Sequence, residues 1–124
     1  MKYLLDSNIL IALGLDANAA VVARAGQCDA DEMVTSAIVF AEVVYGSERG
    51  KPPPLEKLEI MAEEIPVLPF DDNAARAYAS MPFKRASYDR LIAAHALSLG
   101  LMVVTDNEAD FADVPGLKVE NWTV

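Results

Sequence analysis

The chain has 124 residues, with 10 Lys and Arg against 19 Asp and Glu, which gives a formal net charge of −9. This length fits one domain over residues 1–124, and 53% hydrophobic against 23% charged residues excludes a disordered or low-complexity chain. An acidic surface repels a phosphate backbone, so the charge also excludes nucleic-acid binding by bulk attraction and favours divalent cations or basic partners.

The cellular compartment is indicated by the cysteine count and the N-terminal sequence. A single cysteine excludes an intramolecular disulfide and fits a reducing cytoplasm. Asp6 and Asn8 interrupt the N-terminal apolar stretch, which therefore lacks a signal-peptide pattern, and no window holds about 18 uninterrupted apolar residues. We expect a cytoplasmic protein that does not associate with membranes.

Short apolar runs alternate with helical patterns along the first half of the chain. In chain order, these patterns predict a strand at 3–5, helices at 9–13 and 18–25, a strand at 32–35 and a helix at 37–46. Ser36 is a suitable N-cap for the last of these helices, and three prolines at 52–54 form the clearest break in the pattern.

The second half continues the alternation of helices and strands. It predicts a helix at 55–65, a strand at 66–70, helices at 71–81 and 87–100, a strand at 101–104, a short helix ending near 111 and a strand at 117–120. Prolines confine the 66–70 strand to an edge of the sheet. Strands separated by helices predict an α/β fold, a three-layer α/β/α sandwich with a central, mostly parallel sheet.

Four acidic residues are predicted at positions where a surface role is difficult to assign. Asp6 and Asp106 each follow a strand, and ligands of parallel sheets bind outside the carboxyl ends of strands. Glu42 is the only charge within residues 37–45, and burying an unpaired carboxylate is costly. Asp89 lies in the first turn of a predicted helix. The alternatives are helix capping for Asp6 and Asp106, a narrow solvent-facing stripe for Glu42 and a favourable helix dipole for Asp89.

The four acids together favour a metal site. They come from four separate elements, and no histidine or cysteine cluster accompanies them. An all-oxygen ligand set selects a hard cation, Mg²⁺ or Mn²⁺, over zinc. Such a site suits hydrolysis of a phosphodiester by metal-activated water.

Several motifs, in the same order and spacing, resemble the PIN-domain ribonucleases and, within them, the VapC-type toxins. The matching segments are Leu-Leu-Asp-Ser-Asn at 4–8, Ala-Glu-Val-Val-Tyr-Gly at 41–46, Asp-Arg-Leu-Ile-Ala-Ala-His-Ala at 89–96 and Val-Val-Thr-Asp-Asn at 103–107. The resemblance also includes Asp110-Phe111 and covers almost the whole chain. It implies a Mg²⁺- or Mn²⁺-dependent endoribonuclease, the toxin of a type II toxin–antitoxin pair. A homodimer and a cognate VapB-type antitoxin bound next to the active site are also implied.

Site residues are carried over from the resemblance by position. Asp6 and Asp89 are the principal metal ligands, Glu42 completes the catalytic cluster, and either Asp106 or Asp110 is the fourth acid. The residues predicted to contact RNA are Ser7, Asn8, Lys84, Arg85, Arg90 and Asn107, the basic ones holding the RNA backbone beside the acids. His95, the only histidine, is predicted on a different helix face from Asp89, so we expect it to be structural.

Two binding modules remain as alternatives to the enzyme. A phospho-acceptor receiver domain shares the layered fold, but the chain has Asp6-Ser7-Asn8 where a receiver needs an acidic pair. Its Lys118 lies within the last predicted strand rather than after it. A PIN-like domain without catalysis is the second alternative. It is favoured by the short approach over residues 82–86 to the helix of Asp89, since family members usually carry a longer one.

Overall fold

The computed structural model describes residues 1–124 and contains one sheet of five parallel strands in the order β3-β2-β1-β4-β5. The strands are β1 (Tyr3–Leu5), β2 (Met33–Ser36), β3 (Val67–Leu68), β4 (Met102–Val104) and β5 (Val119–Glu120). The predicted three-layer α/β/α class is confirmed. The outer strands are shorter than predicted, and β3 lies at an edge, where its flanking prolines lose no ladder bonds.

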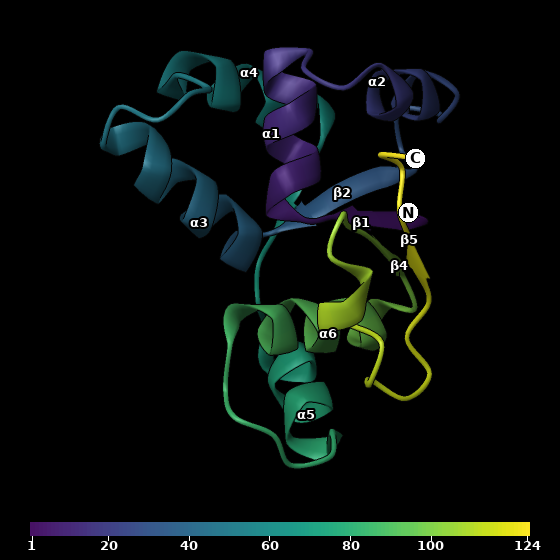
Figure 1. Ribbon diagram of the computed structural model, residues 1–124. Helices are drawn as coiled ribbons and strands as arrows, with labels where there is room; N and C mark the ends of the chain where they lie inside the picture. Colours follow the sequence, from purple (N-terminus) through teal and green to yellow (C-terminus); the bar gives the residue numbers. More distant parts are fainter.

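Six α-helices and one 3₁₀ helix connect and cover the strands. They are α1 (Ser7–Leu15), α2 (Ala19–Gly26), α3 (Ala37–Glu48), α4 (Leu55–Glu64), α5 (Asp72–Ser80), α6 (Tyr88–Leu99) and η1 (Glu108–Asp110). In Figure 1, α1, α2 and α4 lie on one side of the sheet, α5 and α6 lie on the other, and α3 runs outward from the end of β2. No single helix is long and apolar enough to cross a membrane, and only α1 and α2, bent by 93°, pass that test as a pair.

The central strand β1 places the core and the site. Its three residues are buried, and Leu4 lies opposite Val34 of β2 on one side and Val103 of β4 on the other. Burial on both faces explains the continuous apolar runs, which are typical of parallel sheets. Because β1 adjoins both β2 and β4, the carboxyl ends of these three strands lie next to one another.

Side chains predicted from the sequence define where the key helices begin and end. The Ser36 hydroxyl accepts from the Ile38 backbone N–H at 3.0 Å, so β2 leads directly into α3. The Ser87 hydroxyl similarly accepts from the Arg90 N–H at the start of α6, and Gly100 ends that helix with φ of 67°. These caps fix the starts of α3, which carries Glu42 in its second turn, and of α6, which carries Asp89 in its first turn.

Candidate metal and catalytic site

Asp6 lies directly after β1 at the centre of the carboxyl edge and is only 4% exposed. Its Oδ1 accepts from the Ser7 backbone N–H, and its Oδ2 accepts from the Thr105 hydroxyl, both at 2.8 Å. Burial raises the pKa of Asp6, the two hydrogen bonds partly offset that effect, and the charges of Asp106 and Asp110 raise it further. Asp6 therefore caps α1, as one alternative proposed, and also belongs to an acidic cluster.

Glu42 extends from α3 toward the same edge. It is half-buried, and its Oε1 is fully covered yet has no hydrogen-bond partner. Burial, followed by the charges of Asp6 and Asp89, raises its pKa to about 7. One oxygen of Glu42 is thus covered although α3 also has exposed positions at Ala41 and Tyr45, so Glu42 lies at the border of a solvent-facing stripe.

Asp89 lies in the first turn of α6 and is half-buried. Burial raises its pKa first, and the charges of Asp6 and Asp110 raise it further. Three acids that are far apart in sequence thus perturb one another. The fold gathers them at the edge where parallel sheets bind their ligands.

The two candidates for the fourth acid have different surroundings. Asp106 accepts a hydrogen bond from the Asn8 side-chain amide at 3.0 Å, which ties the end of β4 to α1. Asp110, in η1, contributes to the raised pKa of both Asp6 and Asp89. Asp110 therefore lies within electrostatic reach of both principal acids, whereas Asp106 acts on Asp6 alone and its carboxylate also accepts from Asn8.

The donor set of this cluster fits a hard divalent cation. Every candidate ligand is a carboxylate oxygen, and Glu42 offers a covered oxygen that no protein group satisfies. As the side chains stand, no group of three or more acidic, histidine or cysteine residues is arranged to hold an ion. Carboxylates this close repel one another, and a bound cation would convert that repulsion into attraction.

His95 is structural, as the sequence predicted. It is 1% exposed, its Nδ1 lies 2.8 Å from the Ser36 hydroxyl, and the Phe70 ring packs against it edge to face. Burial lowers its pKa, so the neutral form is favoured. His95 thus helps to fix the start of α3, on which Glu42 lies, without joining the acidic cluster.

The structure places the predicted basic patch differently from expectation. Lys84 forms an ion pair with Asp113 at 2.7 Å. The Arg90 side chain is 7% exposed, donates to the Pro82 carbonyl at 2.6 Å and lies 3.6 Å from the same Asp113. Arg90 therefore holds the 81–87 loop against the protein and is largely buried, whereas Lys84 is half-exposed in its ion pair with Asp113 and Arg85 is exposed.

The polar residues predicted to contact RNA have mixed positions. Ser7 lines a small hollow with Glu42, while Asn8 is committed to Asp106. The Asn107 backbone N–H donates to the Thr105 hydroxyl at 3.0 Å. Thr105, which the sequence interpretation passed over, therefore links the turn after β4 to Asp6. Its place between an apolar strand and Asp106 was the available signal.

Sequence reasoning also missed the basic residue nearest to Glu42. Lys51 follows the break after α3 and lines the same hollow as Ser7 and Glu42. Its aliphatic stem lies over Gly46, where an added Cβ would be 3.6 Å from the Lys51 Cδ. Lys51 could not be assigned to the site from the sequence, because only the turn after α3 brings it back beside Glu42.

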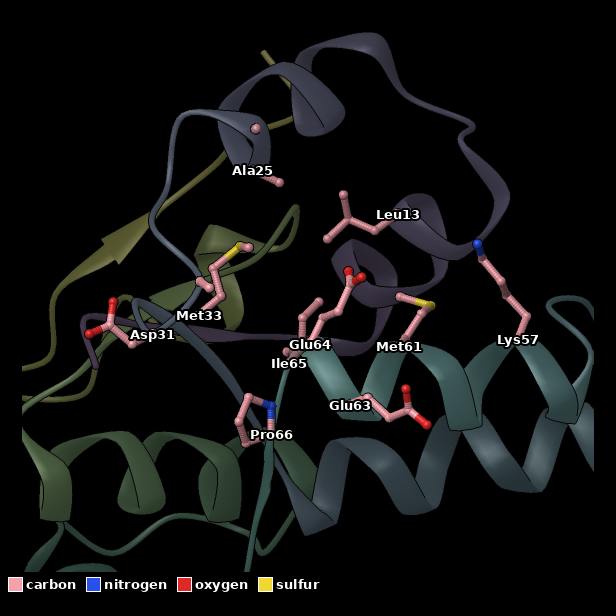
Figure 2. Close-up of a pocket in the computed structure, with 12 residues that line it drawn as sticks. Leu13, Ala25, Asp31, Met33, Lys57, Met61, Glu63, Glu64, Ile65 and Pro66 are labelled. Atoms are coloured by element: carbon pink, nitrogen blue, oxygen red, sulfur yellow. The ribbon is translucent and has the colours of Figure 1, made fainter.

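A separate, larger hollow of about 790 Å³ lies between α1, α2, β2 and α4. Figure 2 shows the Leu13, Met33 and Met61 side chains converging on it, with the Glu64 carboxylate between them. Met33 begins β2, so this hollow lies toward the end of that strand opposite the carboxylates. It is a second surface and is not part of the acidic site.

Comparisons with known proteins agree with this architecture. A family model described as PIN domain matches residues 3–117. The chain is similar to the tRNA(fMet)-specific endonuclease VapC of Shigella flexneri, with 32% identity over 99% of both chains. It is also similar to ribonuclease VapC2 of Haemophilus influenzae, with 30% identity over 98% of both.

Solved structures give the same result at the level of the backbone. The chain superimposes on VapBC2 from Rickettsia felis, bound to a DNA fragment from its promoter, with a TM-score of 0.86 and 25% identity over 98% of this chain and 99% of that one. VapBC from Salmonella typhimurium, also bound to DNA, gives a TM-score of 0.80 and 28% identity over 98% of both chains.

Proposed function

The chain belongs to the PIN domain family, and from that premise we propose that it is a metal-dependent endoribonuclease acting as the toxin of a type II toxin–antitoxin pair. The observation that carries the proposal is the convergence of Asp6, Glu42 and Asp89 from three elements, with one Glu42 oxygen buried and unsatisfied. The similarity to VapC nucleases over the whole chain supports the same reaction and an RNA substrate.

We propose that Asp6, Glu42, Asp89 and Asp110 hold Mg²⁺, for which Mn²⁺ can substitute. The ion would supply an activated water and neutralise charge that develops on the scissile phosphate. Ser7 and Thr105 fix the Asp6 carboxylate in one orientation through their hydrogen bonds. Asp106 supports the site indirectly by holding Asn8. A rigid arrangement of this kind reduces the reorganisation that the reaction requires.

The test combines thermal melting with RNA cleavage in the wild-type protein and in Asp89→Asn. We expect Mn²⁺ to raise the melting temperature of the wild type relative to EDTA, because an ion that binds only the folded state stabilises it. Asp89→Asn should lose that rise and metal-dependent cleavage, yet melt higher than wild type in EDTA, since it removes a repelling charge.

Asp72→Asn is the matched control, because Asp72 also lies in the first turn of a helix but is remote from the cluster. It should retain both the Mn²⁺ response and cleavage. Wild-type protein that neither responds to Mn²⁺ nor cleaves RNA would contradict the proposed activity and favour a non-catalytic binding module.

We further propose that the partner is a VapB-type antitoxin, which the resemblance places beside the acidic site, and that a second segment of it occupies the separate hollow in Figure 2. Several structural neighbours are VapBC complexes. Apolar side chains line the hollow together with the carboxylates of Asp31, Glu63 and Glu64 and the single cation Lys57, so it suits an amphipathic segment with basic side chains. The joint change Glu63→Lys with Glu64→Lys should weaken antitoxin binding at least tenfold and leave RNA cleavage unchanged, as measured by calorimetry and by cleavage of free RNA.

The remaining parts of the proposal are a homodimer and a cytoplasmic location. The homodimer is tested by sedimentation of the purified chain at several concentrations, where a single species of one chain's mass, 13.4 kDa, would contradict it. The location follows from the substrate, since a nuclease toxin acts where cellular RNA is found.

A further inference from the structure

One face of α3 forms a hollow beside Glu42. Ile38, Ala41, Glu42 and Tyr45 are spaced by three and four residues, which places them on the same side of the helix. Tyr88, the first residue of α6, faces them, and the five residues enclose about 380 Å³. Tyr88 immediately precedes Asp89, so the hollow adjoins two of the acids.

The walls of this hollow are aromatic and uncovered. Tyr45 and Tyr88 are each 62% exposed, among the largest exposed apolar side chains of the chain. The Arg49 guanidinium lies over the Tyr45 ring, 3.4 Å from its centroid, and donates to the Tyr45 carbonyl at 3.0 Å. Tyr45 is thus held in a stack with a cation at the entrance to the hollow.

A second, smaller hollow of about 250 Å³ shares Glu42 and Tyr45 with the first. Ser7 and Lys51 give it a polar lining with one cation. Glu42 therefore adjoins both an aromatic, apolar hollow and a more polar one that holds Lys51. A nucleotide presents these two chemistries, an apolar base face and an anionic phosphate, on either side of its sugar.

We propose, resting on the ribonuclease function above, that Tyr45 and Tyr88 bind one unpaired RNA base next to the scissile phosphate, with a neighbouring phosphate near Lys51. Aromatic faces stack bases of any sequence, and Ile38 and Ala41 offer no donor to an anion. A base that is already paired and stacked in a duplex cannot enter, so the hollow selects single-stranded RNA.

The test compares cleavage kinetics of a short single-stranded RNA, with Mg²⁺, in Tyr45→Ala, Tyr88→Ala and the matching Phe variants. Each Ala change should raise KM about tenfold with kcat little altered, because stacking binds the ground state and the transition state alike. The Phe variants should remain within about twofold of wild type. Phe83→Ala is the control, since Phe83 is fully exposed but outside the hollow.

An abasic oligonucleotide of the same length, used as a competitive inhibitor, separates base from backbone binding. Its inhibition constant should be the same for wild type and the Ala variants. Two results would overturn the base site alone, provided that the wild type cleaves RNA. In the first, the Ala variants keep the wild-type KM; in the second, they bind the abasic competitor as weakly as they bind the RNA substrate. Ala variants that keep KM but dissociate a dimer would assign the hollow to contact between copies instead. A wild type with no RNA cleavage would overturn the ribonuclease function itself, and the base site with it.

Discussion

At the scale of single residues, the site consists of carboxyl groups whose charged form is disfavoured by burial and by the like charge of their neighbours. Glu42 has a pKa of about 7 because it is covered by protein and faces Asp6 and Asp89. The pKa values of those two acids are raised for the same reasons, burial first and like charge second. Such a cluster is costly to the fold unless a proton or a cation compensates it.

This cost predicts a pH dependence of stability for the protein in EDTA. The Glu42 pKa in the folded protein lies above its ordinary value of 4.5, so the folded state binds more protons than the unfolded chain between these limits. The free energy of unfolding should therefore fall as pH rises from about 4.5 to about 7. Urea titrations at several pH values measure this slope.

Glu42→Gln should flatten the slope and raise stability at pH 7, whereas Glu59→Gln, on the exposed side of α4, should change neither. A slope that Glu42→Gln leaves unchanged would show that Glu42 is not the titrating group. Asp6 and Asp89 act in the same direction, so some dependence should persist in the variant.

At the scale of elements, the start of α3 determines where Glu42 and Tyr45 lie. The Ser36 hydroxyl serves both the Ile38 N–H and the buried His95 ring, so it joins the end of β2, the start of α3 and the middle of α6. The sequence predicted Ser36 as a cap and His95 as structural. That the two are partners could not be predicted, because 59 residues separate them and only the fold brings them together.

This shared contact predicts that Ser36→Ala is more destabilising than loss of a simple cap. Removing a cap costs about 1 kcal/mol, and leaving a buried ring nitrogen without its partner adds about 1–3 kcal/mol. Asn18→Ala, which removes only the cap of α2, is the matched control and should cost about 1 kcal/mol. Equal losses for the two variants in urea unfolding would contradict the double role of Ser36.

At the scale of the whole molecule, charge is unevenly distributed. The net charge of −9 repels RNA, and Asp113 pairs with Lys84 and lies close to the buried Arg90, two cations that the sequence had assigned to RNA binding. The cation that lines a hollow with Glu42 is instead Lys51, and Arg49 lies over the ring of the neighbouring Tyr45. RNA binding should therefore depend on few phosphate contacts.

This arrangement predicts a weak salt dependence. When the logarithm of single-stranded RNA affinity is plotted against the logarithm of salt concentration, each neutralised phosphate contributes a slope of about −0.7. Two neutralised phosphates therefore give a slope of about −1.4. Fluorescence anisotropy with Asp89→Asn, which should not cleave, measures it. Lys51→Ala should reduce the slope by about 0.7, whereas Lys84→Ala should leave it unchanged. A slope that Lys84→Ala reduces and Lys51→Ala leaves unchanged would show that the 81–87 loop, and not Lys51, contacts the phosphates.

The fold class, the order of strands and helices and the family could all be predicted from the sequence. Local signals carry this information: apolar runs for buried strands, caps such as Ser36 and Ser87, and acids placed directly after strands. Short edge strands such as β5 were the least well predicted, because sheet pairing rather than local sequence sets their ends.

Only the tertiary structure decided which side chains share the site. It engaged Asp106 with Asn8, placed Asp110 within reach of Asp6 and Asp89, paired Lys84 with Asp113, and brought Lys51, Tyr45 and Tyr88 beside Glu42. The physical reason is that electrostatic and stacking contacts depend on distances of a few ångströms between elements. Those distances are set by how helices pack across the sheet, and no local pattern in the sequence encodes them.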